Sequence, residues 1–289
     1  MSKRTITLSN RRINVEVARP GEIYQGSRFD WSGWITKVTL DGEHTFTSAE
    51  SLISGEGTGG FGLCNEFGMN QPIGYHDCLP GETFPKLGVG LLSKPDEAEY
   101  NFFRNYSVNP FPIEITQTNY SITFESDSLA CRGYEARLKK TISIEENMLR
   151  IDYQLINIGS KTLETDEYNH NFVNINGSTL GPAYRLQLPF QVSSSLPKIF
   201  KLSGDTLRWL SEPHEAFYFR EDCPELSNPS WVLTHEPSGV AIKESVNMPL
   251  VRFALWGRSH VVSPELFIKI KVDPGETIEW RREYCFISK

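Results

Sequence analysis

The sequence predicts an all-β protein built as one large antiparallel domain. Apolar residues alternate with polar ones over 13–17, 149–155 and 266–272, which is the period of a strand with one buried face. Helical periodicity is nearly absent: the best candidate, residues 204–215, is limited by Pro213, because proline interrupts a helix. The 17 prolines and 22 glycines lie mostly between the strand patterns, where antiparallel strands need turns.

The individual elements follow from the same patterns. Residues 134–144 and 148–158 are predicted to form a hairpin, because residues 145–147 (EEN) separate two alternating runs. A later strand is expected to begin at Glu265 and to end before the Asp-Pro-Gly-Glu turn at 273–276.

Residues 52–96 differ from the rest because glycines recur through a polar and aromatic segment. This segment is predicted to be a long irregular loop that crosses a sheet face, and such loops often carry binding residues. Within it, residues 57–62 (GTGGFG) lack the Gly-Lys-Ser/Thr ending of a phosphate-binding loop, and no helix pattern follows. A phosphate loop is therefore excluded.

Length and composition restrict the class of protein. No linker or repeat divides residues 1–289, so we expect a single domain. The formal net charge of −7 gives no electrostatic footprint for nucleic acid. No apolar run approaches the roughly 18 residues of a membrane span, and the N-terminus lacks the apolar core of a secretion signal. The five cysteines are odd in number and lack CxxC spacing, which favours reduced thiols and a cytoplasmic location.

Residues 168–175 (YNHNFVNI) form the most informative segment. Alternation places the side chains of Tyr168, His170 and Phe172 on one face, which gives an aromatic surface with one titrating group. The three asparagines of the segment are poor strand formers and point to polar ligands or turns rather than packing. A hydrogen-bonded structural histidine is the alternative interpretation of His170.

Glu265 follows Pro264 and shares its strand face with Phe267, Lys269 and Lys271. A solvent-exposed glutamate is the alternative interpretation. A carboxylate and an imidazole on opposite sides of a sugar's C1–O5 region suffice to interconvert its anomers: one group removes the proton of the O1 hydroxyl and the other protonates the ring oxygen. This chemistry requires no metal, cofactor or covalent intermediate.

Residues 26–34 (GSRFDWSGW) contain candidate sugar-binding side chains. Guanidinium donors and indole faces commonly hold sugar hydroxyls and apolar C–H faces, so Arg28 would orient hydroxyls while Trp31 and Trp34 form a platform. The alternative is a local ion pair between Arg28 and Asp30, with the tryptophans in the core.

Two further candidates, His76 and Lys86, lie in the glycine-rich segment, where each either contacts substrate or is simply exposed. The histidines share no HExxH or HxH spacing. Neither Ser178 nor Ser238 lies in a GxSxG elbow. We therefore expect no metal and no cofactor.

Taken in order, these segments resemble the aldose 1-epimerase (galactose mutarotase-like) family over about residues 24–286. The core of the likeness is residues 138–177, where LRIDY at 149–153 and NIG at 157–159 precede the histidine segment at 168–174. The later matching segments are residues 231–233, 237–239, 249–250, 264–265, 273–276 and 284–286.

The resemblance implies a large antiparallel β-supersandwich. It also implies that Glu265 is the base at O1 and that His170 is the acid at the ring oxygen, with Arg28, Lys86 and Asn228 orienting hydroxyls.

Three features depart from the family pattern. The chain lacks the family's second histidine in a Leu-His-Gly-Gly motif and has His76 and Lys86 in that loop instead. Asn228 stands where the family has its sugar-binding aspartate. The interval between Glu265 and the turn at 274–276 is shorter than in typical galactose enzymes. These departures indicate a divergent member that acts on a different sugar.

The leading hypothesis is a mutarotase that interconverts the α and β anomers of a free or modified hexose, as a monomer or homodimer. A non-catalytic carbohydrate-binding protein would need the aromatic residues and Arg28 but no His/Glu pair. A glycoside hydrolase or polysaccharide lyase would need two carboxylates about 5–10 Å apart, with Asp166 or Glu167 as the partner of Glu265. A basic pair of Arg28 and Lys86 at an open mouth would favour an anionic sugar.

Overall fold

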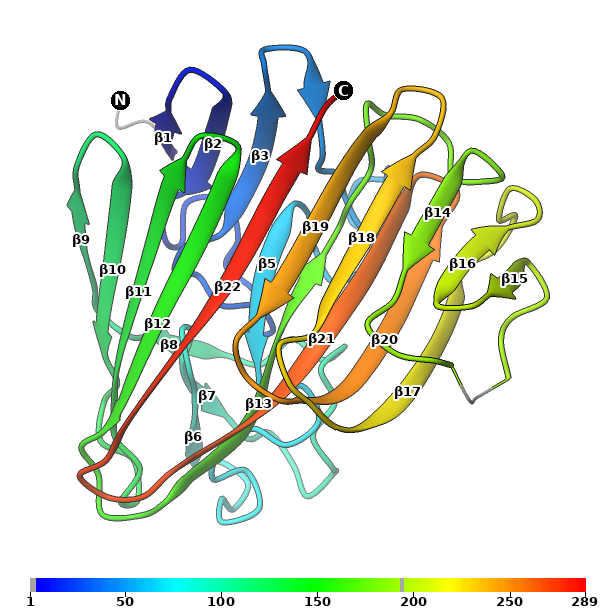
Figure 1. Cartoon of the computed structure of the whole chain (residues 1–289). Helices are drawn as coiled ribbons and strands as arrows, with labels where there is room; N and C mark the ends of the chain where they lie inside the picture. Colours follow the sequence, from blue (N-terminus) through cyan, green and yellow to red (C-terminus); the bar gives the residue numbers. More distant parts are fainter. Residues whose placement is uncertain (1–3, 193–194) are drawn as a thin grey trace.

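The computed structural model describes residues 4–192 and 195–289, and in these ranges it contains strands β1 to β22 and no helix. The strands form two large sheets and one small sheet, and all their pairings are antiparallel. Figure 1 shows the two large sheets as layers that face each other. The all-β prediction is confirmed.

The nine-stranded sheet carries the candidate site at its centre. In spatial order it consists of β1 (Thr5–Ser9), β2 (Ile13–Ala18), β3 (Ile35–Leu40), β5 (Leu63–Phe67), β13 (Leu163–Asn171), β21 (Val261–Val272), β20 (Leu250–Arg258) and β17 (Phe217–Leu226), with β4 (His44–Thr45) paired to β3.

The ten-stranded sheet forms the second layer. In spatial order it consists of β15 (Phe200–Ser203), β16 (Thr206–Trp209), β14 (Tyr184–Gln187), β18 (Ser230–His235), β19 (Val240–Val246), β22 (Thr277–Ile287), β12 (Met148–Asn157), β11 (Ala136–Glu145), β10 (Ser121–Asp127) and β9 (Ile113–Gln117).

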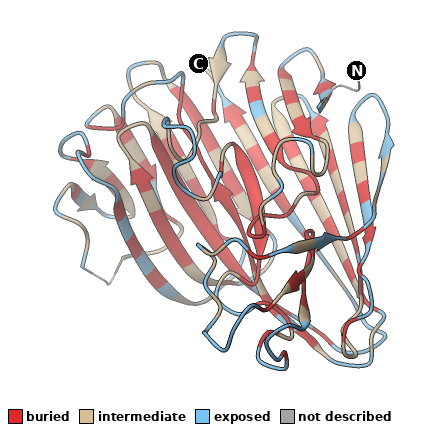
Figure 2. Ribbon diagram, turned by 180° about the vertical axis from the view of Figure 1, so that it is seen from behind, coloured by how far each residue is buried: buried red, intermediate tan, exposed pale blue. Residues whose placement is uncertain are grey.

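A small three-stranded sheet lies beside the nine-stranded one. It consists of β6 (Thr83–Lys86), β7 (Gly90–Ser93) and β8 (Val108–Pro110). Figure 2, seen from behind, shows this small sheet and several loops in front of the nine-stranded sheet, whose central strands are largely buried. The small sheet and these loops therefore cover part of the outer face of the nine-stranded sheet.

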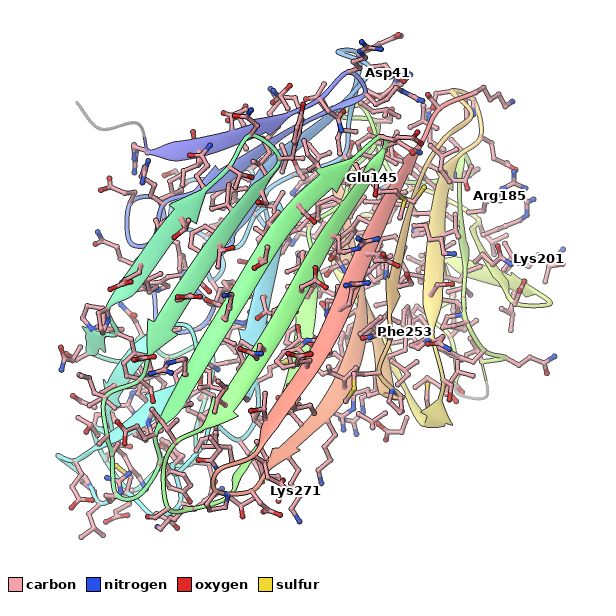
Figure 3. All side chains as sticks on the ribbon, turned by 60° about the vertical axis from the view of Figure 1, so that its left-hand side comes forward. Asp41, Glu145, Arg185, Lys201, Phe253 and Lys271 are labelled. Atoms are coloured by element: carbon pink, nitrogen blue, oxygen red, sulfur yellow. The ribbon has the colours of Figure 1, made fainter. Side chains whose placement is uncertain are left out.

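The main hydrophobic core lies between the two large sheets. It takes Val15 and Phe253 from the nine-stranded sheet and Ile151 and Trp231 from the ten-stranded one, as in a face-to-face sandwich. Figure 3 labels Phe253 among the strands of the two layers. The alternating patterns in the sequence arise here, because one face of each strand enters this core.

Two expectations about local structure are corrected, and one is confirmed. The hairpin predicted around 145–147 is formed by β11 and β12. The helix candidate at 204–215 is wrong: it begins in the β15–β16 hairpin, where Leu207 and Trp209 alternate with less buried residues. The predicted loop at 52–96 is also wrong in part, because it contains β5, β6 and β7. Every residue of β5 is buried, so this strand shows no polar alternation.

Within the described ranges, no helix is long and apolar enough to cross a membrane.

Candidate active site

Strand β13 presents two chemically different faces. Its odd-numbered residues Glu167, Asn169 and Asn171 hydrogen-bond to strands of the ten-stranded sheet, so they point into the space between the sheets. Because side chains alternate along a strand, Tyr168 and His170 point to the outer face of the nine-stranded sheet. The candidate site is on this outer face.

A buried polar network anchors the inner face of β13. Arg282 of β22 donates to Glu167 over 2.8 Å and to Glu244 over 2.7 Å, and all three side chains are fully buried. Asn171 donates to Glu244 over 2.8 Å, and Asn169 donates to the hydroxyl of Tyr284 in the same network. An ion pair buried in this way is hydrogen-bonded to its neighbours on several sides and holds its strands in one register.

The network corrects the interpretation of the asparagines. Asn169 and Asn171 are polar core residues and not ligands. Asn174 does serve a turn, since its side chain donates to the carbonyl oxygens of Ser178 and His260.

On the outer face, the structure brings His170 and Glu265 together. The Nε2 atom of His170 lies 3.3 Å from Oε1 of Glu265. The hydroxyl of Ser263 lies 2.8 Å from His170 Nδ1 and donates to Glu265 Oε1 over 2.9 Å. His170 and Glu265 come from strands β13 and β21, which are neighbours in the sheet. The three side chains form one connected cluster.

The sequence pattern predicted that Glu265 begins its strand, and this prediction is wrong. Strand β21 begins at Val261, which makes Glu265 a buried mid-strand residue. The sequence pattern did not reveal that the strand begins at Val261, because a serine and a proline, Ser263 and Pro264, interrupt the apolar run.

An interruption of the ladder between β13 and β21 makes room for the cluster. The ladder covers Leu163–Glu167 and resumes at the single bridge Val173↔Val262 in the same register. Pro264 lies between these points and has no N–H to donate. The backbone N–H of Asn171 instead donates to the Ser263 hydroxyl over 2.9 Å.

Burial sets the protonation of the pair. Desolvation raises the pKa of Glu265 to about 8, and the hydrogen bond from Ser263 and the nearby Arg28 oppose this shift only in part. Desolvation also lowers the pKa of His170 well below 6.5, and Arg28 lowers it further. Both shifts favour the uncharged form of each group. The contact between them is therefore not a charged salt bridge at neutral pH.

Aromatic rings surround the imidazole of His170. Phe172 stacks on it with 4.0 Å between ring centroids and 9° between planes. Phe29 and Trp256 approach it edge-on at 5.8 and 5.9 Å. Tyr168 lies 6.0 Å away in the same strand. These rings limit water around His170 and present apolar surfaces on this face.

Strand register extends this face toward the edge of the sheet. Glu265 lies opposite Ala254 of β20, which in turn lies opposite Arg220 of β17. Tyr218 of β17 lies opposite Trp256 in the next row and is 53% exposed. Ala254 is itself buried and belongs to a hydrophobic cluster with Tyr168 and Phe267, so the exposed side chain of Tyr218 marks where this face reaches solvent.

A cavity of about 720 Å³ adjoins the same face. Its lining includes Asp166, Arg252, Phe267 and Lys269, and Phe267 stacks on Tyr168 with 4.2 Å between ring centroids. His170 and Glu265 are not among its lining residues. The cavity thus lies beside the cluster, one residue pair further along β13 and β21.

Arg28 and Lys86 converge on one buried carboxylate. Arg28 donates to Glu66 over 2.9 Å and Lys86 donates to it over 3.2 Å. Arg28 also donates to the hydroxyl of Tyr168 over 3.0 Å. The alternative ion pair between Arg28 and Asp30 is not formed, because Asp30 pairs with Lys140 at 2.6 Å. All five of these charged side chains are buried.

This arrangement contradicts the idea of a basic pair at an open mouth. Glu66 neutralises part of the charge of Arg28 and Lys86, and neither cation is exposed. Arg28 instead holds Tyr168, which lies two residues before His170 in β13, and the Tyr168 hydroxyl also donates to Glu66, the carboxylate that Lys86 contacts.

The other predicted binding residues lie at different places. Trp34 is buried among aromatic rings and donates to the carbonyl of Phe61 over 2.7 Å, so it supports the wall around His170 and offers no open platform. Trp31 is half-buried, donates to a backbone carbonyl and packs on the hydrophobic cluster of the small sheet. His76 is exposed at the rim of the 720 Å³ cavity. Asn228 is exposed in the turn after β17, with a left-handed φ of 49°.

Some residues of the cluster escaped the sequence analysis. Ser263 and Glu66 lie in contact with the candidate pair or its neighbours, and Trp256 lies against His170. The sequence contains one indication that Ser263 belongs to the site: it lies two residues before Glu265, and residues two apart share a strand face. Glu167, considered as a carboxylate partner of Glu265, points to the opposite face and bonds to Arg282.

Comparisons with known proteins support the fold. No protein-family model and no curated protein sequence matches this chain. Among solved structures, the Slr1438 protein from Synechocystis sp. PCC 6803 aligns with a TM-score of 0.63 at 13% identity, covering 100% of this chain and 99% of that one.

Two further solved structures carry names that describe the fold. A galactose mutarotase related enzyme from Lactobacillus acidophilus has a TM-score of 0.60 at 14% identity and covers 98% of this chain and 97% of its own. A galactose mutarotase-like protein from Lactobacillus casei ATCC 334 has a TM-score of 0.60 at 14% identity, with coverage of 98% and 100%.

The sandwich of two antiparallel sheets thus has the architecture of the galactose mutarotase-like structures. The chain has the galactose mutarotase-like fold over 98% of its length. The identities of 13–14% make it a divergent representative of that fold.

Proposed function

We propose that the protein is an aldose 1-epimerase that interconverts the α and β anomers of a hexose. Glu265 acts as the base at the O1 hydroxyl, and His170 acts as the acid at the ring oxygen. The observation that carries the proposal is the 3.3 Å contact between His170 Nε2 and Glu265 Oε1 on the outer face of the sheet. The structural neighbours named as mutarotase-related support it.

The geometry fits this reaction because O1 and the ring oxygen O5 are both bonded to C1. Two catalytic groups that act on these oxygens must therefore lie close together. Glu265 takes the O1 proton, His170 protonates O5, the C1–O5 bond breaks and an open-chain aldehyde forms. After rotation about C1–C2, the reverse steps close the ring on the other face. General acid–base assistance of this kind contributes about 10²–10⁴-fold to a rate.

The substrate that we propose is an uncharged aldose. Arg28 and Lys86 are buried against Glu66, so Arg28 acts by positioning Tyr168 and neither cation binds an anionic group. We propose Trp256 as an apolar surface for the sugar ring and Tyr218 as a hydroxyl contact at the exposed flank. The whole chain would act as one cytoplasmic domain, as a monomer or homodimer, without cofactor or metal.

The test is anomer exchange measured by NMR saturation transfer across a panel of neutral, phosphorylated and sulfonated aldoses. Glu265→Gln and His170→Asn should each reduce catalysed exchange by at least about 10²-fold, with unchanged circular dichroism. Glu164→Gln, at an exposed glutamate of β13, and His214→Asn, at an exposed histidine, are matched controls and should retain full activity.

Wild-type exchange rates in both site variants would refute the assignment. Sugar binding by calorimetry, without acceleration of any anomer, would instead identify a carbohydrate-binding protein. Release of sugar from a glycoside would favour a hydrolase, with Asp166 as the second carboxylate, because Glu167 is bonded within the core.

A further inference from the structure

The hydroxyl of Ser263 is in contact with three polar groups at once. It accepts from the backbone N–H of Asn171 over 2.9 Å, lies 2.9 Å from Glu265 Oε1 and lies 2.8 Å from His170 Nδ1. Ser263 itself is fully buried. These contacts use the complete hydrogen-bonding capacity of a hydroxyl, which has one proton and two acceptor lone pairs.

This donor and acceptor capacity limits the hydrogen bonds that Ser263 can make to His170 and Glu265. Asn171 N–H always occupies one lone pair, so one proton and one lone pair remain. If the hydroxyl donates to Glu265, its remaining lone pair is free to accept from His170 Nδ1–H. If it donates to His170 Nδ1, it must accept from a protonated Glu265. In either case, the hydroxyl links a donor to an acceptor across the pair.

We propose that Ser263 relays a proton between Glu265 and His170, so that His170 acts as the acid from its neutral form. The relay rests on the aldose 1-epimerase function proposed above. It assigns to Ser263 a positioning and proton-transfer role in addition to the roles of His170 and Glu265.

The proton transfers balance in both directions. Before reaction, Glu265 is a carboxylate that accepts from the Ser263 hydroxyl, and neutral His170 carries its proton on Nε2. The hydroxyl turns to donate to Nδ1 once Glu265 is protonated. The O1 proton passes to Glu265, the proton of Glu265 passes to the Ser263 oxygen, and the Ser263 proton passes to His170 Nδ1. The Nε2 proton passes to O5 as the C1–O5 bond breaks and the C1=O1 bond forms. Ring closure reverses every transfer and restores the starting tautomer.

Burial explains why a relay is needed. A charged imidazolium in this aromatic enclosure is costly because it loses its hydration, and the pKa of His170 is lowered accordingly. Without a proton at Nδ1, loss of the Nε2 proton would leave an imidazolate, which is far more costly still. The relay supplies the Nδ1 proton in the same step. The titratable groups around the pair are Arg28, Cys64, Glu66, Tyr168, Tyr218 and Glu244.

Ser263→Ala tests the relay, with Ser263→Thr as the variant that keeps the hydroxyl. Ser128→Ala is the matched control, because Ser128 is also a buried serine whose hydroxyl accepts a backbone N–H, that of Ala136, over 2.6 Å. Ser263→Ala should lower anomer exchange at pH 7 at least about tenfold, Ser263→Thr should recover most of it, and Ser128→Ala should leave it unchanged.

The pH profile separates a relay from simple packing. In the wild type, exchange should rise as Glu265 ionises and stay high at alkaline pH. In Ser263→Ala the exchange rate should pass through an optimum and fall at alkaline pH. Without the relay, His170 can act as the acid only as an imidazolium, and the imidazolium is lost as pH rises. An unchanged rate and profile in Ser263→Ala would overturn the relay, as would equal losses in Ser263→Ala and Ser128→Ala.

A readout independent of turnover is the ¹⁵N chemical shift of the His170 ring nitrogens. Ser263→Ala should shift the Nδ1 resonance, whereas Ser128→Ala should not. Unchanged His170 shifts in Ser263→Ala would show that the bond is absent and would overturn the relay, even if Ser263→Thr does not fold. Lack of exchange by the wild type on every aldose would overturn the proposed function itself, which is a different result from an active wild type with an unaffected Ser263→Ala variant.

Discussion

The ring of Phe172 lies flat against the imidazole of His170, with 4.0 Å between centroids and 9° between planes. The position of Phe172 depends on a missing side chain: a Cβ at Gly60 would lie 2.3 Å from the Phe172 ring. The loop before β5 can therefore cover the site only because residue 60 is glycine. The stack fixes one face of the imidazole and leaves its nitrogens directed at Ser263 and Glu265.

Gly60→Ala should displace Phe172 and, with it, His170. We expect a loss of stability of about 1–3 kcal/mol, typical of an overpacked site, together with a clear fall in anomer exchange. Gly181→Ala is the control, since its nearest contact is an ordinary 3.6 Å. Urea unfolding and exchange rates measure the two effects, and equal behaviour of both variants would contradict the packing argument.

The pH dependence of activity should report Glu265. The base must be ionised to accept the O1 proton, and burial raises the pKa of Glu265 to about 8. We therefore expect kcat/KM to rise from pH 6 to pH 9 with an apparent pKa near 8, because this constant reports the free enzyme. A constant kcat/KM over that range, measured by polarimetry, would exclude Glu265 as the base.

The same carboxyl should make wild-type stability depend on pH. Its folded-state pKa, about 8, is above the ordinary value of 4.5, so the folded state binds this proton more tightly than the unfolded state. Its contribution is complete below pH 4.5 and is lost as pH rises toward 8. The loss is on the order of 5 kcal/mol as an upper bound.

Glu265→Gln removes that ionisation. Relative to the wild type, the variant should therefore gain stability between pH 5 and pH 9, while it loses activity. Urea unfolding at both pH values measures the difference, and Glu164→Gln serves as the exposed control. If the free energies of unfolding of the wild type and Glu265→Gln differ by the same amount at pH 5 and at pH 9, the pKa of Glu265 is not raised.

Removal of Glu66 should be strongly destabilising. Its carboxylate bonds to Arg28 and Lys86 inside the protein, so Glu66→Ala leaves two buried cations without their counter-ion. Loss of one partner of a buried pair costs about 3–5 kcal/mol. Chemical denaturation should show this loss, whereas Glu164→Ala, at the exposed ion pair with Lys269, should change little. Comparable small effects in both would mean that water reaches Glu66.

Much of the fold could be predicted from alternation, because strands with one buried face leave a period-two pattern. Strand β12 and the β11–β12 hairpin are such cases. Strand β5 was missed because it is buried on both faces, and the start of β21 was hidden by Ser263 and Pro264. Alternation also predicted the common face of Tyr168, His170 and Phe172, which the structure shows.

The site could be predicted only in part. His170 and Glu265 were chosen from their flanking residues and from resemblance, and the structure shows them in contact. The partners of Arg28 could not be derived, because Glu66 and Tyr168 reach it through strand pairing between β5 and β13. The exposed positions of His76 and Asn228 likewise depend on loop paths that local patterns do not specify.

The sequence by itself determined the class of fold, since the period of burial is a local property of each strand. It also determined which face of β13 each side chain occupies. Only the tertiary structure decided which strands are neighbours and where the ladder between β13 and β21 is interrupted. At that interruption the Ser263 hydroxyl lies between an imidazole and a carboxyl, because contacts between distant strands depend on sheet order and register rather than on local pattern.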